Sequence, residues 1–461
     1  MSSVESTSTE SLCPECLRRI PAFRISEGLD FYLLKTCPEH GTFKTIIWRG
    51  PPGLEALLEP KTAEKPSVTN MASSAGCPLD CGLCPEHAQQ SCCVLLEVTA
   101  RCDLGCPVCF ASAGEPTGPD PDLGEIERWY RLLQESAGTC NVQLSGGEPT
   151  MRDDLPEIIA MGRSMGFSFI QVNTNGMRLS LDPQYARSLK DAGLSTVFLQ
   201  FDGLDDRIYR TIRGRPLLEI KQAAIKSCAE VQLGVVLVPT LIPGVNTGEV
   251  GRILEYAMGQ LPHVRGVHFQ PVSYFGRYPT KPGDEDRYTL PELMRDIELQ
   301  SEGLVSAVGL HPSGCEHSLC SFHGCFVLMP DGSVRSLTDD ERSPSCCGNG
   351  DRVSAVERAR NFVARRWSLG ADSTTCCDAG SDPTASWDAF LARVRGHGFT
   401  VTAMAFQDVW NLDLERLRNC CLHVVSPDLR IVPFCSYNLT SSTGESLHRR
   451  VLNAAAIRDV G

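Results

Sequence analysis

The chain has 461 residues, and its 43 lysines and arginines against 56 aspartates and glutamates give a formal net charge of −13. This acidic balance argues against a general nucleic-acid binder, which normally presents a basic surface. Hydrophobic residues make up 42% of the chain and charged residues 21%, which is typical of a globular protein and excludes wholesale disorder. The chain has no run of about 18 apolar residues, so no membrane span is predicted. The first residues lack the basic and apolar segments of a signal peptide.

The unusual number is the 23 cysteines. Small secreted domains use such a density for disulfides. A long chain without an export signal more often uses it for metal binding or redox chemistry. We therefore expect a cytoplasmic protein with no nucleic-acid partner, whose cysteines group by metal site.

Two short cysteine motifs come first in the chain. Cys13-Pro-Glu-Cys16 and Cys37-Pro-Glu-His40 each offer two ligands on a tight turn, on either side of a strand-like stretch. A Cys3His set suits tetrahedral zinc, or a single iron if a fourth thiolate takes the place of the histidine. We predict a zinc-ribbon or rubredoxin-like metal domain over residues 1–75, with these four side chains as its ligands.

A second cysteine cluster follows at residues 76–92. Cys77, Cys81 and Cys84 have the spacing Cys-x3-Cys-x2-Cys, and Cys92 stands close behind them. Four thiolates so near in sequence suit an iron–sulfur cluster. The segment is therefore predicted to be an auxiliary [4Fe–4S] site.

From residue 93 to about 310 the chain alternates short apolar strand patterns with amphipathic helix patterns. The predicted strands are 93–99, 141–146, 167–174, 195–202, 233–241 and 264–272. The predicted helices are 122–136, 154–165, 182–192, 216–231, 248–260 and 290–303. Six strand–helix repeats imply a parallel sheet with right-handed crossovers, and functional residues of such a sheet gather where its strands end.

Polar and glycine-rich motifs stand at those ends. The first strand is followed by Cys102-x3-Cys106-x2-Cys109-Phe110 and the second by Gly146-Gly147-Glu148-Pro149, while Asn173, Asn175 and Asp202 end the third and fourth strands. Three thiolates can bind three irons of a [4Fe–4S] cluster and leave the fourth iron open to a substrate. The two glycines allow close approach of another group to the backbone.

The cysteine motif and the Gly-Gly-Glu-Pro motif together resemble the radical S-adenosylmethionine (SAM) superfamily. The resemblance implies an α/β fold with a partial (β/α)6 TIM-like radical SAM barrel over residues 93–310. It also implies that Cys102, Cys106 and Cys109 are catalytic and hold a [4Fe–4S] cluster that binds SAM. Reductive cleavage of SAM would then give a 5′-deoxyadenosyl radical that modifies an unactivated C–H bond.

The resemblance further implies which residues bind SAM. Gly146, Gly147 and Pro149 would flank its methionine moiety, Glu148 or nearby carbonyls would accept hydrogen bonds from its amino group, and Phe110 would lie beside its adenine. Asn173, Asn175 and Asp202 are candidates for contacts with its ribose or carboxylate. Their alternative is capping and turn chemistry, to which Asn and Asp are suited.

A closer resemblance covers nearly the whole chain. The segment from Gly76 to Cys102 is similar to the group that includes the tetraether lipid synthases and the methanopterin-ring methylases. The segment from Asp408 to Asn438 is similar to a bacterial branch of proteins, called TrsS, which are predicted to be radical SAM (seleno)proteins. These relatives favour methylation or C–C bond formation, with an external electron donor and a small-molecule, lipid or peptide substrate left open.

Residues 311–461 contain two predicted hairpins, the first over residues 325–335 and the second over residues 421–435. The second resembles auxiliary-cluster domains of other radical SAM enzymes and would place Cys421 opposite Cys435, while Cys315-x4-Cys320 offers another pair. The resemblance implies a C-terminal α+β auxiliary-cluster domain in which these four cysteines hold a further [4Fe–4S] cluster.

Four pairs of adjacent cysteines are the last feature: 92–93, 346–347, 376–377 and 420–421. Neighbouring strand residues face opposite ways, so both members of a pair rarely bind one metal. A strained, reducible disulfide is the alternative, which would suit a thiol-redox sensor. An electron-transfer or metal-binding protein without catalysis is the competing function, but such a protein has no use for a Gly-Gly-Glu-Pro site.

Overall fold

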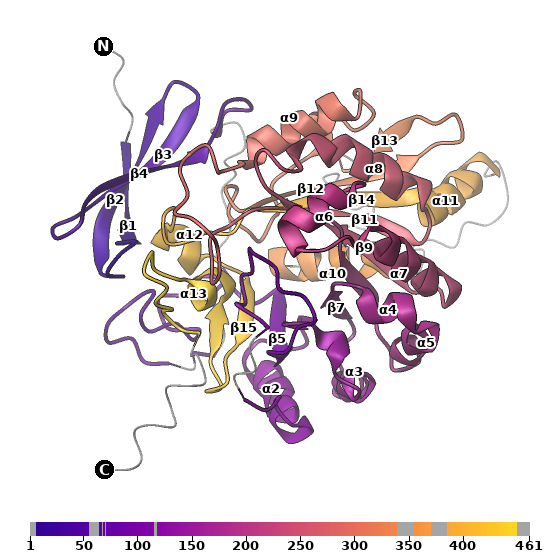
Figure 1. Ribbon diagram of the computed structural model, residues 1–461, viewed down its shortest axis with the longest axis horizontal. Coiled ribbons are helices and arrows are strands. Elements are labelled where there is room, and N and C mark those ends of the chain that lie inside the picture. The colour runs from indigo at the N-terminus through magenta and orange to yellow at the C-terminus, as the bar shows by residue number, and fades with distance from the viewer. Residues whose placement is uncertain are drawn as a thin grey trace, which may run out of the picture.

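The structure of the protein is a computed structural model. It describes residues 6–54, 64–66, 68–69, 71–114, 118–338, 354–369 and 385–449, with backbone alone for 385–388. The strands within these ranges form two sheets (Figure 1), a small N-terminal sheet and a large sheet that carries the rest of the fold. Among the described residues, no helix is both long and apolar enough to cross a bilayer.

The N-terminal sheet is an antiparallel meander. Its strands are β1 (Ser6–Leu12), β2 (Arg19–Glu27), β3 (Asp30–Cys37) and β4 (Gly41–Trp48), paired in chain order. The turn between β1 and β2 and the turn between β3 and β4 lie at the same end of the sheet, because alternate connections of a meander share one end. This topology brings the two N-terminal cysteine motifs together.

The large sheet contains a run of parallel strands flanked by helices. In spatial order these strands are β5 (Cys93–Thr99), β6 (Asn141–Gly146), β7 (Ile170–Thr174), β8 (Thr196–Gln200), β9 (Gly234–Val238) and β11 (Val264–Pro271), and the short β10 (Thr240–Leu241) pairs with β11. The helices of this part are α2 (Leu123–Ser136), α3 (Leu155–Ser164), α4 (Met177–Leu181), α5 (Pro183–Asp191), α6 (Asp206–Arg213), α7 (Leu218–Glu230), α8 (Val250–Gly259) and α9 (Leu290–Gln300). The partial (β/α)6 architecture is confirmed, and β5 and β6 have the predicted bounds. The short α4 and α6, which stand in loops, were not predicted.

The chain after residue 310 extends the same sheet at both edges. Its elements are β12 (Ser321–Leu328), β13 (Val334–Ser336), α10 (Ala355–Trp367), α11 (Ala385–His397), β14 (Gly398–Met404), α12 (Leu414–Arg418), β15 (Leu422–Val425), β16 (Ile431–Pro433) and α13 (Phe434–Asn438). Strand β14 runs parallel beside β11, and β15 runs parallel beside β5. An open barrel leaves backbone groups unpaired at both edge strands, and the C-terminal segment pairs them. The described strands of residues 311–461, which were predicted as a domain, thus share their sheet with the barrel.

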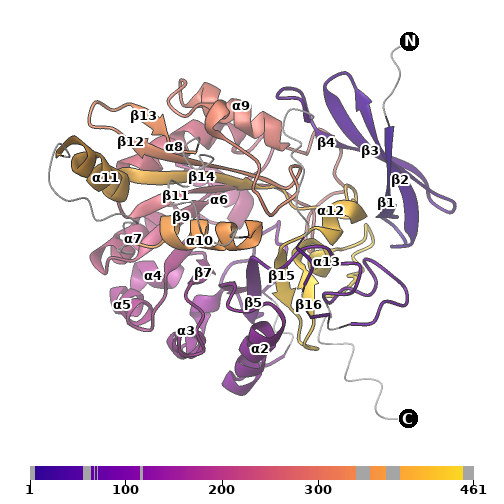
Figure 2. The same ribbon diagram turned by 180° about the vertical axis from the view of Figure 1, so that it is seen from behind.

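The two faces of the barrel strands differ. Side chains on the outer face, such as those of Val142, Leu144 and Val172, are buried in the core against the surrounding helices. The inner face lines a cavity of about 500 Å³. The cavity extends from loops that follow the strands, such as the loop of Cys102, to residues that precede them, such as Cys92. Figure 2 shows α10 lying across the strands on this side, where Trp367 and Val363 pack against Phe198.

Candidate functional site

The cysteine loop after β5 lies at one end of the cavity. Cys102, Cys106 and Cys109 all line it. A backbone bridge holds the loop, because Cys109 N–H donates to the Arg277 carbonyl at 2.9 Å and Arg277 N–H donates back at 3.0 Å. The Arg277 guanidinium also donates to the Cys106 carbonyl at 3.0 Å. Arg277, which was not among the predicted site residues, therefore anchors the loop.

These three sulfurs are arranged openly. The described residues contain two groups of three or more Cys, His, Asp or Glu side chains whose ligand atoms all lie within 4.8 Å of one another. Neither group contains the loop cysteines. A wider ring that opens on a cavity suits a multi-iron cluster with one iron free for a ligand. Burial raises the pKa of the Cys102 thiol to about 12, and a bound metal cation would favour its thiolate form. The donor set fits a [4Fe–4S] cluster.

The two glycines after β6 are required by the neighbouring backbone. A Cβ added to Gly146, whose φ is +125°, would lie 2.1 Å from the Thr99 carbonyl oxygen, and one added to Gly147 would lie 2.1 Å from the Arg101 oxygen. Glu148 N–H donates to that Arg101 oxygen at 2.8 Å. Sequence reasoning assigned the glycines to a close approach of SAM. The structure shows a close approach to the start of the cysteine loop, and both glycines also line the cavity.

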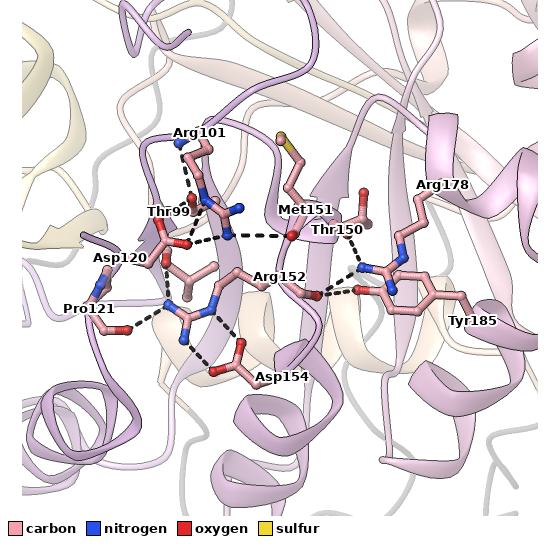
Figure 3. A network of polar contacts seen from close by, with 11 residues as sticks. Thr99, Arg101, Asp120, Pro121, Thr150, Met151, Arg152, Asp154, Arg178 and Tyr185 are labelled. Carbon is pink, nitrogen blue, oxygen red and sulfur yellow. Dashed lines mark hydrogen bonds and ion pairs between the residues drawn. The ribbon is translucent and has the colours of Figure 1, made fainter. Parts of the chain in front are cut away.

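A polar network holds this backbone from outside (Figure 3). The Arg152 guanidinium donates to the carbonyl of Val98 at 2.8 Å and forms an ion pair with Asp154 at 2.6 Å. Arg101 forms an ion pair with Asp120 at 2.5 Å. The end of β5, from which the cysteine loop begins, is therefore tied to the segments that precede α2 and α3.

Glu148 is buried, and its carboxylate joins two strand ends. One oxygen accepts from the hydroxyls of Thr150 at 2.6 Å and Thr174 at 2.7 Å, and the other accepts from Asn175 N–H at 2.6 Å. Burial raises the pKa of Glu148 despite these donors. In the predicted contact, the SAM amino group would donate to a carboxylate that already connects the end of β6 to the end of β7. Pro149 is buried at the start of the turn Pro149–Met151.

The asparagines after β7 have different surroundings. Asn173 lines the cavity, and its side chain has no hydrogen-bond partner within the described part of the chain. Asn175 lines it too, but its Nδ2 donates to Asp103 Oδ1 at 2.6 Å, which ties the end of β7 to the cysteine loop. Asn173 is thus the asparagine whose amide is free for a ligand.

Asp202 is fully buried and acts through an arginine. Its two oxygens accept from the Arg213 guanidinium at 2.7 and 2.9 Å. Burial opposes the charge on Arg213, but Asp202 and the nearby Cys106 together raise its pKa above its usual value. Arg213 lines the cavity, whereas Asp202 stands behind it. Arg213 was not among the predicted site residues; the aspartate at the strand end, shortly before it, was the available signal.

An aromatic wall stands beside the cysteine loop. The ring of Phe110 lies 5.8 Å from that of Phe434, which in turn lies 4.5 Å from Phe406. All three side chains line the cavity. An apolar aromatic surface of this kind suits an adenine ring, which is the contact predicted for Phe110.

The N-terminal cysteine motifs form a closed ligand set. The ligand atoms of Cys13, Cys16, Cys37 and His40 all lie within 4.8 Å of one another. His40 Nδ1 is 3.6 Å from the Cys13 sulfur and 3.5 Å from the Cys37 sulfur, and the Cys16 and Cys37 sulfurs are 4.0 Å apart. Ligands about 2.3 Å from a tetrahedral zinc stand about 3.8 Å from one another. The donor set fits one zinc ion.

Comparison with known proteins agrees with both sites. The Radical SAM superfamily model matches residues 96–257, and the HMPTM N-terminal zinc ribbon domain model matches residues 6–49. The 7,8-dihydro-6-hydroxymethylpterin dimethyltransferase of Methanocaldococcus jannaschii is 35% identical over 96% of this chain and 94% of its own. The chain belongs to the radical SAM superfamily. Its full-length match places it in the family of that pterin enzyme, and the predicted N-terminal zinc ribbon is confirmed.

Other relatives match this radical SAM protein over shorter lengths. The probable GTP 3′,8-cyclase of Methanothermobacter thermautotrophicus is 33% identical over 35% of the chain, and the match spans 52% of the cyclase. Among solved structures, Streptococcus suis SuiB bound to its precursor peptide SuiA matches with a TM-score of 0.40 and 16% identity, over 47% of this chain and 46% of SuiB.

The remaining cysteines of the radical SAM protein group differently from the prediction. The sulfur of Cys421 lies 3.2 Å from that of Cys92 and 3.4 Å from that of Cys315. These three cysteines are buried, and the half-buried Glu316 completes a set whose ligand atoms lie within 4.8 Å of one another. Sequence reasoning placed Cys92 with the 77–84 cysteines and Cys421 opposite Cys435. The reason for the difference is that β15 pairs with β5, so that the Cys421 carbonyl accepts from Cys92 N–H at 2.8 Å.

Two further sulfur groups remain. Cys77, Cys81 and Cys84 line one small pocket together with His87. Burial raises the pKa of Cys420 well above its usual value, and Cys435 and Cys320 raise it further. Cys420 is not part of the set that contains Cys421, as expected for adjacent residues of an extended chain, whose side chains face opposite ways. The pairs 346–347 and 376–377 lie outside the described residues.

Proposed function

We propose that the protein methylates a carbon of a small-molecule substrate by radical SAM chemistry. The observation that carries this proposal is that the three loop cysteines open onto a cavity of about 500 Å³. A cavity of this size suits small-molecule ligands. The full-length match to a dimethyltransferase supports methyl transfer as the reaction.

A reduced [4Fe–4S] cluster, when bound, supplies the electron that cleaves the SAM sulfonium and gives a radical able to take hydrogen from an unactivated C–H bond. The overall methylation balances with two SAM molecules and two electrons from an external donor. The products are the methylated substrate, S-adenosylhomocysteine, 5′-deoxyadenosine and methionine. We place this reaction in the cytoplasm.

The cavity residues have distinct parts in this proposal. Arg213, fixed by Asp202, offers a buried guanidinium to the SAM carboxylate. Asn173 offers a free amide to the ribose, and Phe110 a flat surface to the adenine. At the other end, α10 packs against the barrel strands and excludes water, which protects a radical from stray hydrogen donors.

Auxiliary metal sites follow from the observed grouping. We infer that Cys92, Cys315 and Cys421, with Glu316, hold one auxiliary group, since their ligand atoms already lie within 4.8 Å of one another. A second auxiliary group would belong to Cys77, Cys81 and Cys84, which share a pocket. Cys320 and Cys435, predicted as ligands with Cys315 and Cys421, are not part of the first set, and both raise the pKa of Cys420.

The test is product analysis on anaerobically reconstituted protein. With SAM, dithionite and 7,8-dihydro-6-hydroxymethylpterin, the wild type should release 5′-deoxyadenosine and S-adenosylhomocysteine. Cys109→Ala should release neither. Cys228→Ala, which removes a buried cysteine of α7 outside the cavity, should keep both products.

Two outcomes would contradict the proposal in different ways. 5′-Deoxyadenosine without S-adenosylhomocysteine would retain SAM cleavage and exclude transfer of the SAM methyl group to this substrate. A fully iron-loaded protein that neither cleaves SAM nor changes its EPR spectrum when SAM is added would exclude the enzyme itself.

A further inference from the structure

Four metal-binding side chains meet at the end of the cavity that precedes the barrel strands. The ligand atoms of Cys92, Cys315, Glu316 and Cys421, here called the Cys92 set, all lie within 4.8 Å of one another. The Cys421 sulfur lies 3.2 Å from that of Cys92 and 3.4 Å from that of Cys315. Thiolates that share one tetrahedral zinc ion stand about 3.8 Å apart. All four ligand atoms are therefore close enough to share a single ion.

This spacing does not fit a [4Fe–4S] cluster. The thiolates of such a cluster bind different irons, so they stand farther apart than ligands that share one ion. The loop of Cys102 shows the wider arrangement. The Cys92 set is instead as compact as the N-terminal set, which belongs to a zinc ribbon, and in the described part of the chain these are the two sets of this kind. The observed geometry thus differs from the [4Fe–4S] cluster predicted for Cys315 and Cys421.

The surrounding structure holds the cysteines of the set in place. Cys92 N–H donates to the Cys421 carbonyl at 2.8 Å, where β15 begins to pair with β5. The buried side chain of Gln89 donates to the Cys315 carbonyl at 3.2 Å. Ala355, at the start of α10, packs against all three cysteines. These contacts outside the ligand set fix the three sulfurs at positions that one ion can bridge.

A disulfide would explain fewer of these side chains. It would join two of the three sulfurs and leave the third thiol and the Glu316 carboxylate beside it. The two closest sulfurs, those of Cys92 and Cys421, are 3.2 Å apart, whereas a disulfide bond is about 2.05 Å long. One zinc ion uses all four ligand atoms.

Glu316 is the ligand on the cavity side of the set. Glu316 and Cys92 line the cavity, whereas Cys315 and Cys421 are buried and do not line it. The exposed Arg358 of α10, the helix that packs against the set, also lines the cavity and brings a positive charge to this anionic group of ligands. Soft thiolates suit zinc better than a carboxylate oxygen does. The carboxylate, which the N-terminal set lacks, is therefore the ligand that gives way most easily.

We propose that the Cys92 set holds a single zinc ion, with Glu316 as an exchangeable fourth ligand that faces the cavity. The three thiolates hold the ion, as three protein ligands do in catalytic zinc sites, and the fourth position passes to a donor atom of a molecule in the cavity. Such a molecule is held between the zinc and the loop of Cys102. This assignment rests on the proposed function, since it names the group at the auxiliary site, and its test measures metal instead of SAM cleavage.

Metal analysis of the full-length, anaerobically purified protein tests the kind of ion. The count is made after iron–sulfur reconstitution with excess iron, so that zinc in a vacant cluster site is exchanged for iron. Wild-type protein should keep two zinc ions, one at the N-terminal set and one at the Cys92 set. Cys421→Ala should lose one zinc and keep its iron. Cys228→Ala, the same change at an equally buried cysteine of α7, should keep both zinc ions.

The rate of zinc transfer to a chelator tests the fourth ligand. With 4-(2-pyridylazo)resorcinol, wild-type protein should release zinc in two phases, because the N-terminal set is closed and the Cys92 set has a replaceable carboxylate. Glu316→Cys supplies a fourth thiolate and should slow the fast phase by at least about tenfold, since even changes outside a ligand set alter zinc affinity by that factor. Glu357→Cys, the same change at an exposed residue of α10, should leave both phases unchanged.

Three results would overturn the inference. One is an iron-loaded wild-type protein with zinc at the N-terminal set alone, which needs no variant to fold. Another is a Cys421→Ala protein that keeps both zinc ions and loses iron, as a [4Fe–4S] cluster at this set requires. The third is equal zinc release by wild type and Glu316→Cys. A protein with two zinc ions that fails to cleave SAM rejects the proposed function and keeps this site, whereas SAM cleavage by a protein with one zinc rejects this site alone.

Discussion

The N-terminal metal site and the cysteine loop of the barrel use the same residue type at the ends of strands, with opposite designs. Cys13, Cys16, Cys37 and His40 close on one another within 4.8 Å, and they come from two turns at one end of a small sheet. The loop cysteines stand wider apart and share a cavity of about 500 Å³ with the SAM-motif residues. The first set leaves no room for a further ligand, whereas the second borders a space that a ligand can occupy.

This difference teaches how to tell a structural metal site from a reactive one without a bound metal. Four mutually close ligands complete a tetrahedral zinc and leave no open position, as in structural zinc sites. Three thiols around a cavity leave a position that a substrate can fill. Loss of the first site should therefore affect folding, and changes around the second should affect ligand binding.

The largest expected effect comes from opening the closed site. Cys37→Ser should remove one equivalent of zinc and unfold the N-terminal sheet, because structural zinc contributes about 10–16 kcal/mol to folding in small domains. Metal analysis and limited proteolysis measure both losses. Iron bound at the Cys102 loop should be unchanged.

Thr36→Ser, at an exposed neighbour on the same strand, is the matched control and should keep the zinc. The interpretation of a closed structural site fails if Cys37→Ser retains its zinc and its resistance to protease.

The second effect concerns the ion pair behind the cavity. Asp202→Asn should destabilise the protein by about 3–5 kcal/mol, because it leaves the Arg213 charge buried without its partner. It should also weaken SAM binding, since Arg213 loses the group that orients it. Chemical unfolding and SAM titration measure the two changes.

Asp205→Asn, at the more exposed N-cap of α6, is the matched control and should leave SAM binding unchanged. Equal effects of the two substitutions on SAM binding would mean that Asp202 does not act through Arg213.

The comparison also shows which parts of the molecule sequence can predict. The bounds of β5 and β6 and the ligands of the Cys102 loop follow from local patterns, because a strand's apolar run and a loop's cysteine spacing are written in consecutive residues. The zinc set follows from two neighbouring turns of one meander.

Long-range pairing was beyond such patterns. The group of Cys92, Cys315 and Cys421 depends on β15 running beside β5, and nothing in either strand's own sequence selects that neighbour. The same holds for Arg213, whose burial against Asp202 is set by the packing of α6 on the barrel. Pairing decided by tertiary structure is what single-sequence reasoning lacks.

A smaller effect is expected at the glycine motif. Gly147→Ala would place its Cβ against the Arg101 carbonyl and force the cysteine loop to shift, at a cost of about 3 kcal/mol. The shift should also broaden the EPR spectrum of the SAM-bound protein. Gly259→Ala, at the end of α8 with open space around its Cβ, should change stability by less than about 0.5 kcal/mol. Equal costs of the two substitutions would show that the Gly147 contact is not tight.

The smallest expected effect appears only in acid and tests whether His268, which lines the cavity, is neutral in the folded protein. His268 faces Phe198, Trp367 and Thr402, and burial lowers its pKa from 6.5 to about 3. Between these values the unfolded chain binds a proton that the folded protein does not, so folding stability falls as the pH drops below 6.5. From pH 7 to pH 5 the loss should be about 2 kcal/mol, at about 1.4 kcal/mol for each pH unit below 6.5.

His268→Asn removes the titrating group, so the free energy of unfolding of the variant, measured in urea, should fall by that much less over the same range. The free energies of unfolding of the two proteins should change in parallel from pH 7 to pH 8. Parallel curves down to pH 5 would mean that His268 is protonated in the folded protein. The cavity wall would then carry an additional positive charge at His268.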